Sequence, residues 1–310
     1  MPTDCLAQSH YLDLIAKANY GLGFVDEALA IQREMLECAD IEVEHRLNYA
    51  KNLLEADLCD LAEVQLKEIL KQNPSDQHAL AYLGANMRIK SSPKEALLNN
   101  YDELVRGYIV EAPQGFDSIE NFCAELSAYL GDLHTGIRSP LDQTLQGGTQ
   151  TRGNLFNDEN PLIKSLVTQF RPKIADYLQQ TMNLTGDEFG FQGLVDEYEF
   201  AGSWSVRLSS QGFHTSHVHP MGRISSVFYV ALPPLKEGDS EKQGWLKFGE
   251  PKLQLKTPLA ASHFVKPMVG KLVLFPSYMW HGTVPFNSVG IRTTIAFDIA
   301  NKGSVGELFD

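Results

Sequence analysis

The sequence predicts an α+β fold, in which a helical repeat region at residues 1–105 precedes a β-barrel or jelly roll at residues 188–310. Three observations predict this class. Alanines recur at a fixed interval near the start of the chain, as in helical repeat proteins. A long amphipathic helical pattern occupies the middle of the chain. From about residue 188 the apolar residues alternate with small or polar ones, as in short strands. Residues 106–187 are then a helical connector with helices that buttress the β-domain.

The repeat region is defined by Ala28, Ala62 and Ala96, which lie 34 residues apart. Small residues at such points let paired helices approach closely. The pattern resembles degenerate tetratricopeptide repeats, because Arg46 and Leu80 stand where a Trp is usual. The resemblance implies a concave surface for a protein or peptide partner, whereas an array this short can equally cap the rest of the chain or form a dimer. The helices are expected at residues 8–20, 25–38, 43–56, 59–72, 76–90 and 93–106.

Residues 105–145 are expected to be helical, with the apolar spacing of Phe116 to Leu130 ending at Gly131. The segment Gly147 to Thr151 is rich in turn residues. Leu162 to Leu184 then has apolar residues at four-residue steps, which predicts a helix that covers one face of a sheet. Earlier in the chain, the charged run Glu42-Glu44-His45-Arg46 is expected on a solvated helix face.

Three of the nine histidines, His214, His217 and His219, fall within six residues. A β-branched and aromatic run that reads as a buried strand follows them. Residues i and i+2 of an extended chain point to one face, so His217 and His219 can aim two imidazoles at one metal ion. His214 is three positions from His217 and would face the other way if the strand began that early. His281, which follows the strand pattern of residues 270–276, is the candidate for a third ligand.

The last strand pattern, Val289 to Phe297, contains one arginine. Because an unpaired buried charge is costly, Arg292 is expected to face inward and to pair with a carboxylate. Thr294 lies two residues on, on the same face. The carboxylate belongs either to a ligand or to an internal residue such as Glu197 or Asp298. His263, between turn segments, is expected at the surface rather than in a metal site.

Together these pieces resemble the Fe(II)/2-oxoglutarate-dependent oxygenases, specifically a bacterial branch with an HxHP motif, over roughly residues 140–300. The resemblance implies a double-stranded β-helix with Fe(II) held by His217, His219 and His281. It also implies that Arg292 binds the distal carboxylate of 2-oxoglutarate with Thr294 beside it. The matching pieces are Gly147-Gly148-Thr149-Gln150-Thr151, His217-Val218-His219-Pro220, Ser225-Ser226-Val227-Phe228-Tyr229, Gly270 to Pro276, His281 and Arg292-Thr293-Thr294.

Two features leave alternatives open. Most of the superfamily has His-x-Asp or His-x-Glu where this chain has His217-Val218-His219, so an imidazole replaces the carboxylate of the usual facial triad. Tyr229 faces the cofactor or is a packed strand tyrosine. The activity that the resemblance implies is hydroxylation of an unidentified small-molecule, peptide or protein substrate. The alternatives are a three-His enzyme without 2-oxoglutarate, either a direct dioxygenase or a zinc enzyme, and a non-catalytic metal-binding scaffold.

The charge and the cysteine content of the chain limit the kinds of partner and the compartment that are expected. The formal net charge of −13 argues against binding to nucleic acid or to anionic membranes, which require a basic face. No run of about twenty apolar residues predicts a membrane span, and the first residues lack the pattern of a signal peptide. A cytoplasmic protein with reduced thiols is expected, because the cysteines show no paired spacing. They are Cys5, Cys38, Cys59 and Cys123.

Overall fold

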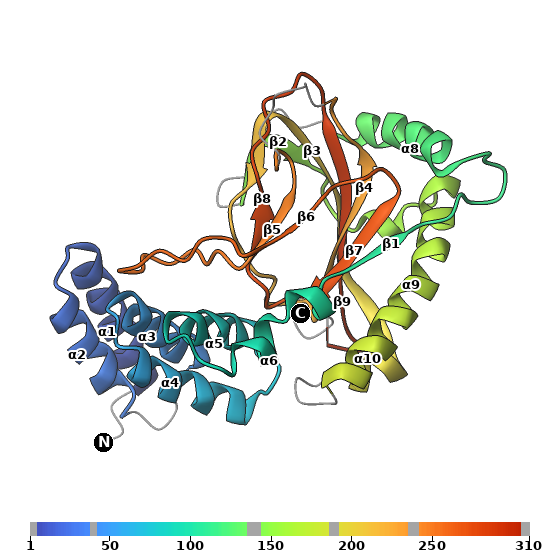
Figure 1. Ribbon diagram of the computed structural model, residues 1–310. Helices are drawn as coiled ribbons and strands as arrows, with labels where there is room; N and C mark the ends of the chain where they lie inside the picture. Colours follow the sequence, from blue (N-terminus) through green and yellow to red (C-terminus); the bar gives the residue numbers. More distant parts are fainter. Residues whose placement is uncertain (1–4, 38–41, 135–143, 186–191, 235–241, 305–310) are drawn as a thin grey trace. The chain divides into compact units, whose positions relative to one another are not determined.

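The computed structural model describes residues 5–37, 42–134, 144–185, 192–234 and 242–304. These residues form helices in the first part of the chain and two antiparallel sheets in the second, which confirms the predicted α+β class (Figure 1). The chain divides into two compact units. The first contains residues 1–98 and 253–259, and the second contains residues 99–252 and 260–310.

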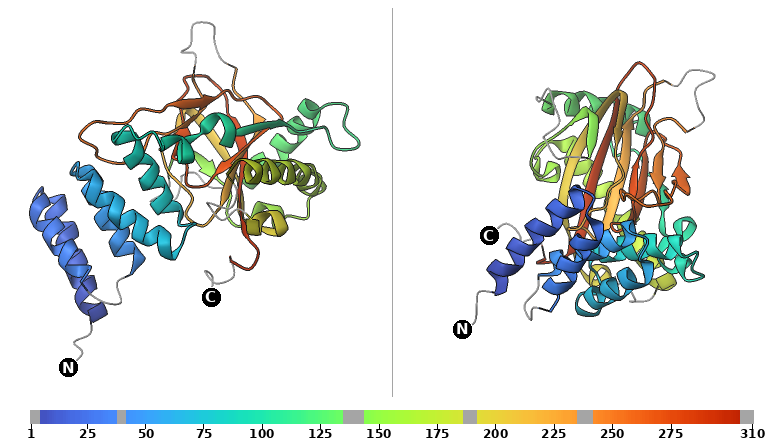
Figure 2. Two further views of the ribbon diagram at one scale, coloured as in Figure 1. Left: turned by 60° about the horizontal axis from the view of Figure 1, so that its bottom comes forward. Right: turned by 90° about the vertical axis from the view of Figure 1, so that its left-hand side faces the viewer.

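The first unit is built from consecutive helices that pack as neighbours, α1 with α2, α3 with α4, and α4 with α5 (Figure 2). Five of the predicted helical runs are confirmed to within a few residues. The helix α5 begins where the Asp76 carboxylate accepts a hydrogen bond of 2.8 Å from the amide of Ala79, a typical N-cap. The helices are α1 (Cys5–Gly21), α2 (Val25–Met35), α3 (Val43–Glu55), α4 (Cys59–Gln72) and α5 (Gln77–Ile89).

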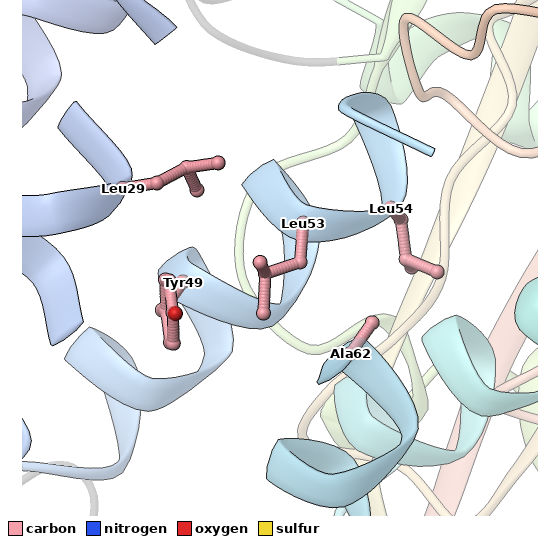
Figure 3. Packing of buried hydrophobic residues seen from close by; sticks show 5 residues of the cluster. All are labelled: Leu29, Tyr49, Leu53, Leu54 and Ala62. Atoms are coloured by element: carbon pink, nitrogen blue, oxygen red, sulfur yellow. The ribbon is translucent and has the colours of Figure 1, made fainter. Parts of the chain in front are cut away.

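The core of this unit gathers apolar side chains from successive helices (Figure 3). Leu29 of α2 meets Tyr49 and Leu53 of α3, and Ala62 of α4 is fully buried beside them. A large residue at position 62 would separate α3 from α4, so the close packing of these two helices requires a small side chain there.

A segment distant in sequence completes the first unit. Leu253 and Leu255 pack against the same apolar cluster. Between them, the amide of Gln254 donates a hydrogen bond of 3.0 Å to the Glu55 carboxylate, which also accepts one of 2.9 Å from the Tyr20 hydroxyl. Alanine periodicity contains no information about this contact, which was not predicted.

Two local predictions for this region are wrong. The sixth helical run, 93–106, is broken into α6 (Glu95–Asn99) and α7 (Tyr101–Leu104), and the chain continues as a strand. In the charged run at the start of α3, the His45 side chain is buried rather than solvated, with 5% of its surface exposed.

The second unit contains a six-stranded sheet of order β1-β7-β4-β9-β3-β2 and a three-stranded sheet of order β6-β5-β8. Every pairing in both sheets is antiparallel. The two sheets face each other across a cavity, in the arrangement of a double-stranded β-helix. The strands are β1 (Arg106–Ile109), β2 (Leu145–Gln150), β3 (Tyr198–His214), β4 (Ile224–Ala231), β5 (Leu246–Phe248), β6 (His263–Val265), β7 (Lys271–Pro276), β8 (His281–Thr283) and β9 (Arg292–Asn301).

Helices cover the outer face of the larger sheet, as Figures 1 and 2 show for α9 (Pro161–Thr185). The ring of Phe170 on α9 lies 5.1 Å from Phe228 of β4 and 5.3 Å from Phe297 of β9, measured between ring centroids. This contact confirms the predicted buttressing helix. The other elements of this layer are α8 (Ile119–Leu133), the short helix η1 (Leu155–Asn157) and α10 (Gln192–Asp196).

The larger sheet begins earlier in the chain than the change of period near residue 188 predicted. The strand β1 lies in a region expected to be helical, and its four residues are too few to show a period. The strand β2 replaces the expected turn around Gly147, which has a φ of +64° and lies at a register shift between Gln146 and Gly148. The glycines therefore serve a β-bulge rather than a turn.

The thiols of Cys59 and Cys123 are free. Cys38 lies outside the described residues. Among the helices in the described part of the chain, none is both long enough and apolar enough to cross a bilayer.

Candidate metal and carboxylate site

A cavity of about 50 Å³ lies between the two sheets of the second unit. Its walls come from β3, β4 and β9 of the larger sheet, from β5 and β8 of the smaller one, and from the segment that follows β3. The lining combines apolar side chains with histidines and one arginine, and includes Trp204, Val206, His214, His217, His219, Ser226, Leu246, His281, Thr283, Arg292 and Thr294.

The structure brings His217, His219 and His281 together. One ring nitrogen of each lies within 4.8 Å of the others. The backbone fixes this proximity, because the amide of His217 donates to the carbonyl of His281 at 2.9 Å and the amide of His281 donates back at 3.0 Å. A bridge between the segment after β3 and the first residue of β8 therefore sets the spacing of two of the three imidazoles.

Each of these imidazoles has its Nδ1 atom 2.7–2.8 Å from an acceptor, which assigns the ring proton to Nδ1. The acceptor is the carbonyl of Thr215 for His217 and the carbonyl of Met279 for His281. The Nε2 atoms are then left with free lone pairs. Ligating histidines in proteins are oriented by contacts of this kind.

The Nδ1 atom of His219 contacts both carboxylate oxygens of Asp298, at 2.8 and 2.7 Å. The same carboxylate accepts a hydrogen bond of 2.7 Å from Ser225, whose hydroxyl also lies 2.8 Å from that of Ser277. The second ligand position of the motif, His219, is thus an imidazole, and the Asp298 carboxylate lies directly behind it.

The electrostatics of the cavity favour neutral imidazoles at two of the three positions. Burial, reinforced by the neighbouring histidines, holds the pKa of His217 and of His281 well below the ordinary value. Burial acts in the same direction on His219, but the charge of Asp298 and its hydrogen bond outweigh it and raise the pKa of this histidine. A neutral imidazole is the form that binds a metal ion.

Arg292 lies at the start of β9 with 2% of its surface exposed, and its guanidinium carbon is 5.1 Å from the centre of the Tyr229 ring. Among the residues that the structure describes, no carboxylate forms an ion pair with it. The two internal candidates have other partners, since Glu197 pairs with Lys302 and Asp298 with His219.

The buried polar groups around Arg292 are incompletely paired. Within the described chain, Nε of Arg292 and the Tyr229 hydroxyl have no hydrogen-bond partner. Thr294 lines the same cavity two residues along the strand. Since an unpaired buried cation is costly, this corner of the cavity suits a ligand carboxylate.

Two further histidines, His214 and His263, lie outside the group of three. The condition under which His214 would face away is not met, because β3 ends at this residue; its ring lines the cavity, 5.7 Å from that of His217. Its Nδ1 lies 3.1 Å from the Thr144 hydroxyl, and it stands outside the group of three. His263 is half-buried in β6, stacked on Tyr101 at 5.7 Å, and takes no part in the cavity.

Two residues near the histidines were not predicted as part of the site. The Trp204 ring lies 5.6 Å from that of His219 and forms part of the cavity wall. Asp298 was considered only as a partner for Arg292. Its place in a strand that alternates inward and outward offered a weak signal, since a carboxylate in such a buried strand requires a partner.

No curated protein matches this chain. Among solved structures, a prolyl-4-hydroxylase from Pseudomonas putida is 16% identical, with 67% of this chain and 98% of that chain covered and a TM-score of 0.40. A prolyl hydroxylase from Trichoplax adhaerens, in complex with a hypoxia inducible factor peptide, is 12% identical, with coverages of 74% and 96% and a TM-score of 0.43. HygX from Streptomyces hygroscopicus, with nickel and 2-oxoglutarate bound, is 13% identical, with coverages of 67% and 87% and a TM-score of 0.39.

The fold places three histidines and one buried arginine in a single cavity between two antiparallel sheets. Residues 202–298 match the model of a family described as "Putative 2OG-Fe(II) oxygenase". This part of the chain is therefore similar to a family that, by its description, uses Fe(II) and 2-oxoglutarate. The matched segment includes the three histidines, Arg292 and Asp298.

Proposed function

We propose that the second unit is an Fe(II)- and 2-oxoglutarate-dependent dioxygenase that hydroxylates a small-molecule, peptide or protein substrate. One observation supports this most strongly. A single cavity holds three imidazoles whose Nδ1 atoms are directed at other acceptors, and a buried guanidinium for which the described residues offer no carboxylate partner. The ligand set would hold a metal ion, and the guanidinium would hold an acid.

In this proposal His217, His219 and His281 hold Fe(II) through their Nε2 atoms. Bound Fe(II) and 2-oxoglutarate supply the oxidation, in which O₂ converts 2-oxoglutarate to succinate and CO₂ and oxidises a C–H bond of the substrate. The backbone acceptors of His217 and His281 keep the rings in the metal-binding tautomer.

His219 takes the place of the usual ligand carboxylate, and we propose that Asp298 compensates for the loss of charge. An imidazole that donates its Nδ1–H to a carboxylate is a stronger base at Nε2 than a free imidazole. The negative charge of the usual ligand carboxylate would thus be supplied by Asp298, which contacts His219 and would not contact the metal ion itself.

We propose that Arg292 binds the distal carboxylate of 2-oxoglutarate through its planar fork of donors. The Thr294 hydroxyl lies on the same face of β9 and adds a further donor. The Tyr229 ring lies beside the guanidinium, and its hydroxyl can donate a further hydrogen bond to the bound carboxylate.

For the helical unit we propose recruitment of a protein or peptide, in the manner of tetratricopeptide-like repeats, with residues 1–105 as the predicted repeat region. Stacked helix pairs with small residues at their contacts, as at Ala62, support this assignment. The free thiols of Cys59 and Cys123 favour a cytoplasmic location. Deletion of the helices together with a measurement of substrate turnover would separate recruitment from capping.

Titration of 2-oxoglutarate into anaerobically prepared, Fe(II)-loaded protein tests the enzymatic proposal, with succinate release as the second readout. Wild-type protein is expected to bind one 2-oxoglutarate per chain only when Fe(II) is present. The His281→Ala variant should lose Fe(II) and 2-oxoglutarate binding together. The matched His263→Ala variant should retain both, because this histidine lies outside the cavity.

A second candidate is favoured by the absence of a carboxylate among the three clustered ligands. A three-His site also suits a dioxygenase that activates its substrate directly, or a zinc enzyme. In that case the protein would bind metal ions through the same histidines, Fe(II)-loaded protein would not bind 2-oxoglutarate, and Arg292 would bind an acidic group of the substrate. If no metal ion bound at all, both candidates would be excluded.

A further inference from the structure

A second group of potential metal ligands lies within the first unit. His10 is on α1, Glu42 is the residue before α3, and His45 is in the first turn of α3. One ligand atom of each lies within 4.8 Å of the others. The Glu42 carboxylate sits between the two rings, 3.5 Å from Nε2 of His10 and 3.8 Å from Nε2 of His45.

His45 is the residue that marks this group as unusual. Its side chain is 5% exposed, yet neither ring nitrogen has a hydrogen-bond partner within the described chain. Buried polar groups without partners destabilise a fold, so they are rare without a cause. Its Nδ1 lies 3.5 Å from a carboxylate oxygen of Asp13 that is also buried and unpartnered. The oxygenase site does not account for any of these groups.

The chemistry of the group matches a borderline divalent cation. Two imidazoles and one carboxylate form a common ligand set for zinc in proteins, with a fourth position left for water. His10 and Glu42 have half-exposed side chains, with 54% and 45% of their surface accessible, so an ion can reach the group from solvent. Asp13 stands behind His45 as Asp298 stands behind His219, where a carboxylate orients a ligating imidazole.

We propose that His10, Glu42 and His45 form a second divalent-metal site that takes Zn(II) and fastens α1 to the start of α3. Metal binding would use the lone pair of His45 Nε2 and would draw its Nδ1–H toward Asp13, so both orphaned nitrogens would gain partners. Since 35 residues separate His10 from His45 in the sequence, such a bond would cross-link the helical unit. Zn(II) would then control the stability of this unit independently of the oxygenase cavity.

The test uses the full-length chain in a His217→Ala/His281→Ala background, which removes the predicted oxygenase ligands. Calorimetric titration with Zn(II) is expected to show one equivalent bound per chain in this background. Adding His10→Ala or Glu42→Gln should weaken that binding at least about tenfold, as the loss of groups that support a metal typically does. Both substituted side chains are half-exposed, so these variants should fold.

The matched control is Glu44→Gln, which removes a carboxylate on an exposed residue of the same helix outside the group. Its Zn(II) affinity should equal that of the background protein. The proposal is overturned if the background protein binds no Zn(II), or if His10→Ala and Glu42→Gln bind as tightly as Glu44→Gln. Because the background protein already lacks two of the predicted oxygenase ligands, Zn(II) binding at His10, Glu42 and His45 is measured independently of the oxygenase site.

Discussion

Replacing Arg292 by methionine separates its two expected effects. If the guanidinium binds 2-oxoglutarate, the variant should bind the co-substrate about 2–5 kcal/mol more weakly, which is the usual cost of removing one member of a buried charged pair. That cost corresponds to a loss of about 30-fold to a few thousand-fold in affinity. Fe(II) binding should be unchanged, because Arg292 is outside the three clustered histidines.

The structure adds an expectation about stability. In the protein without ligand, Arg292 is 2% exposed and has no carboxylate partner in the described chain, so its burial opposes folding. Methionine fills a similar volume without a charge, and such replacements are often neutral or stabilising by about 1–4 kcal/mol. Arg292→Met should therefore have a free energy of unfolding equal to or above that of the wild type. The lost contact with Tyr229, worth about 0.5–2 kcal/mol, is the largest opposing effect.

The assay combines 2-oxoglutarate titration of Fe(II)-loaded protein with urea unfolding of the metal-free protein. Arg207→Ala is the matched control, because Arg207 pairs with Thr293 in the neighbouring strand and does not line the cavity. It should bind 2-oxoglutarate as the wild type does. A folded Arg292→Met protein with wild-type affinity would refute the assignment, and a large loss of stability would reveal a partner for the guanidinium within the protein.

Three further predictions follow from particular contacts. Asp298→Asn should weaken Fe(II) binding about 10- to 100-fold, because the carboxylate that orients His219 is lost, and Fe(II) titration would show no change if Asp298 merely filled space. Gly148→Ala should destabilise the second unit by about 1–3 kcal/mol in urea unfolding, since a Cβ there would lie 2.5 Å from the carbonyl oxygen of Arg207, whereas Gly107→Ala, with nothing closer than 3.6 Å, should be tolerated. Burial and the charge of Arg207 lower the pKa of His134 to about 4. As the pH falls below about 6.5, the unfolded state therefore takes up a proton before the folded state does, and the free energy of unfolding should fall between pH 6.5 and 4. His134→Gln should remove about 1 kcal/mol or less of that loss at pH 5, a figure reduced because the ring is only half-buried, and an unchanged pH dependence would contradict it.

The parts of the site that sequence spacing predicted are those that a short stretch of chain determines. His217 and His219 share a face because they are two residues apart, and so do Arg292 and Thr294. The pairing of His217 with His281 depends on a bridge between distant segments, which the strand pattern before residue 281 suggested without specifying. The change of period near residue 188 located most of the strands, but β1 and β2 were missed because they are short and glycine-containing.

Spacing alone did not reveal that Arg292 and Asp298, two charged residues of the same strand, contact different partners. Asp298 lies 79 residues from His219, so spacing does not suggest that they are in contact. An alternating strand that contains both Arg292 and Asp298 instead suggests an ion pair between these two residues. The structure assigns them to different neighbours, since β9 places Arg292 over Tyr229 and Asp298 against His219 and Ser225. The aspartate is thereby engaged, and the arginine is left as a buried cation without an acidic partner in the described chain. Because a buried cation without an acidic partner is costly, the surroundings of Arg292 are a stronger argument for a carboxylate ligand than the Arg-x-Thr spacing that first indicated it.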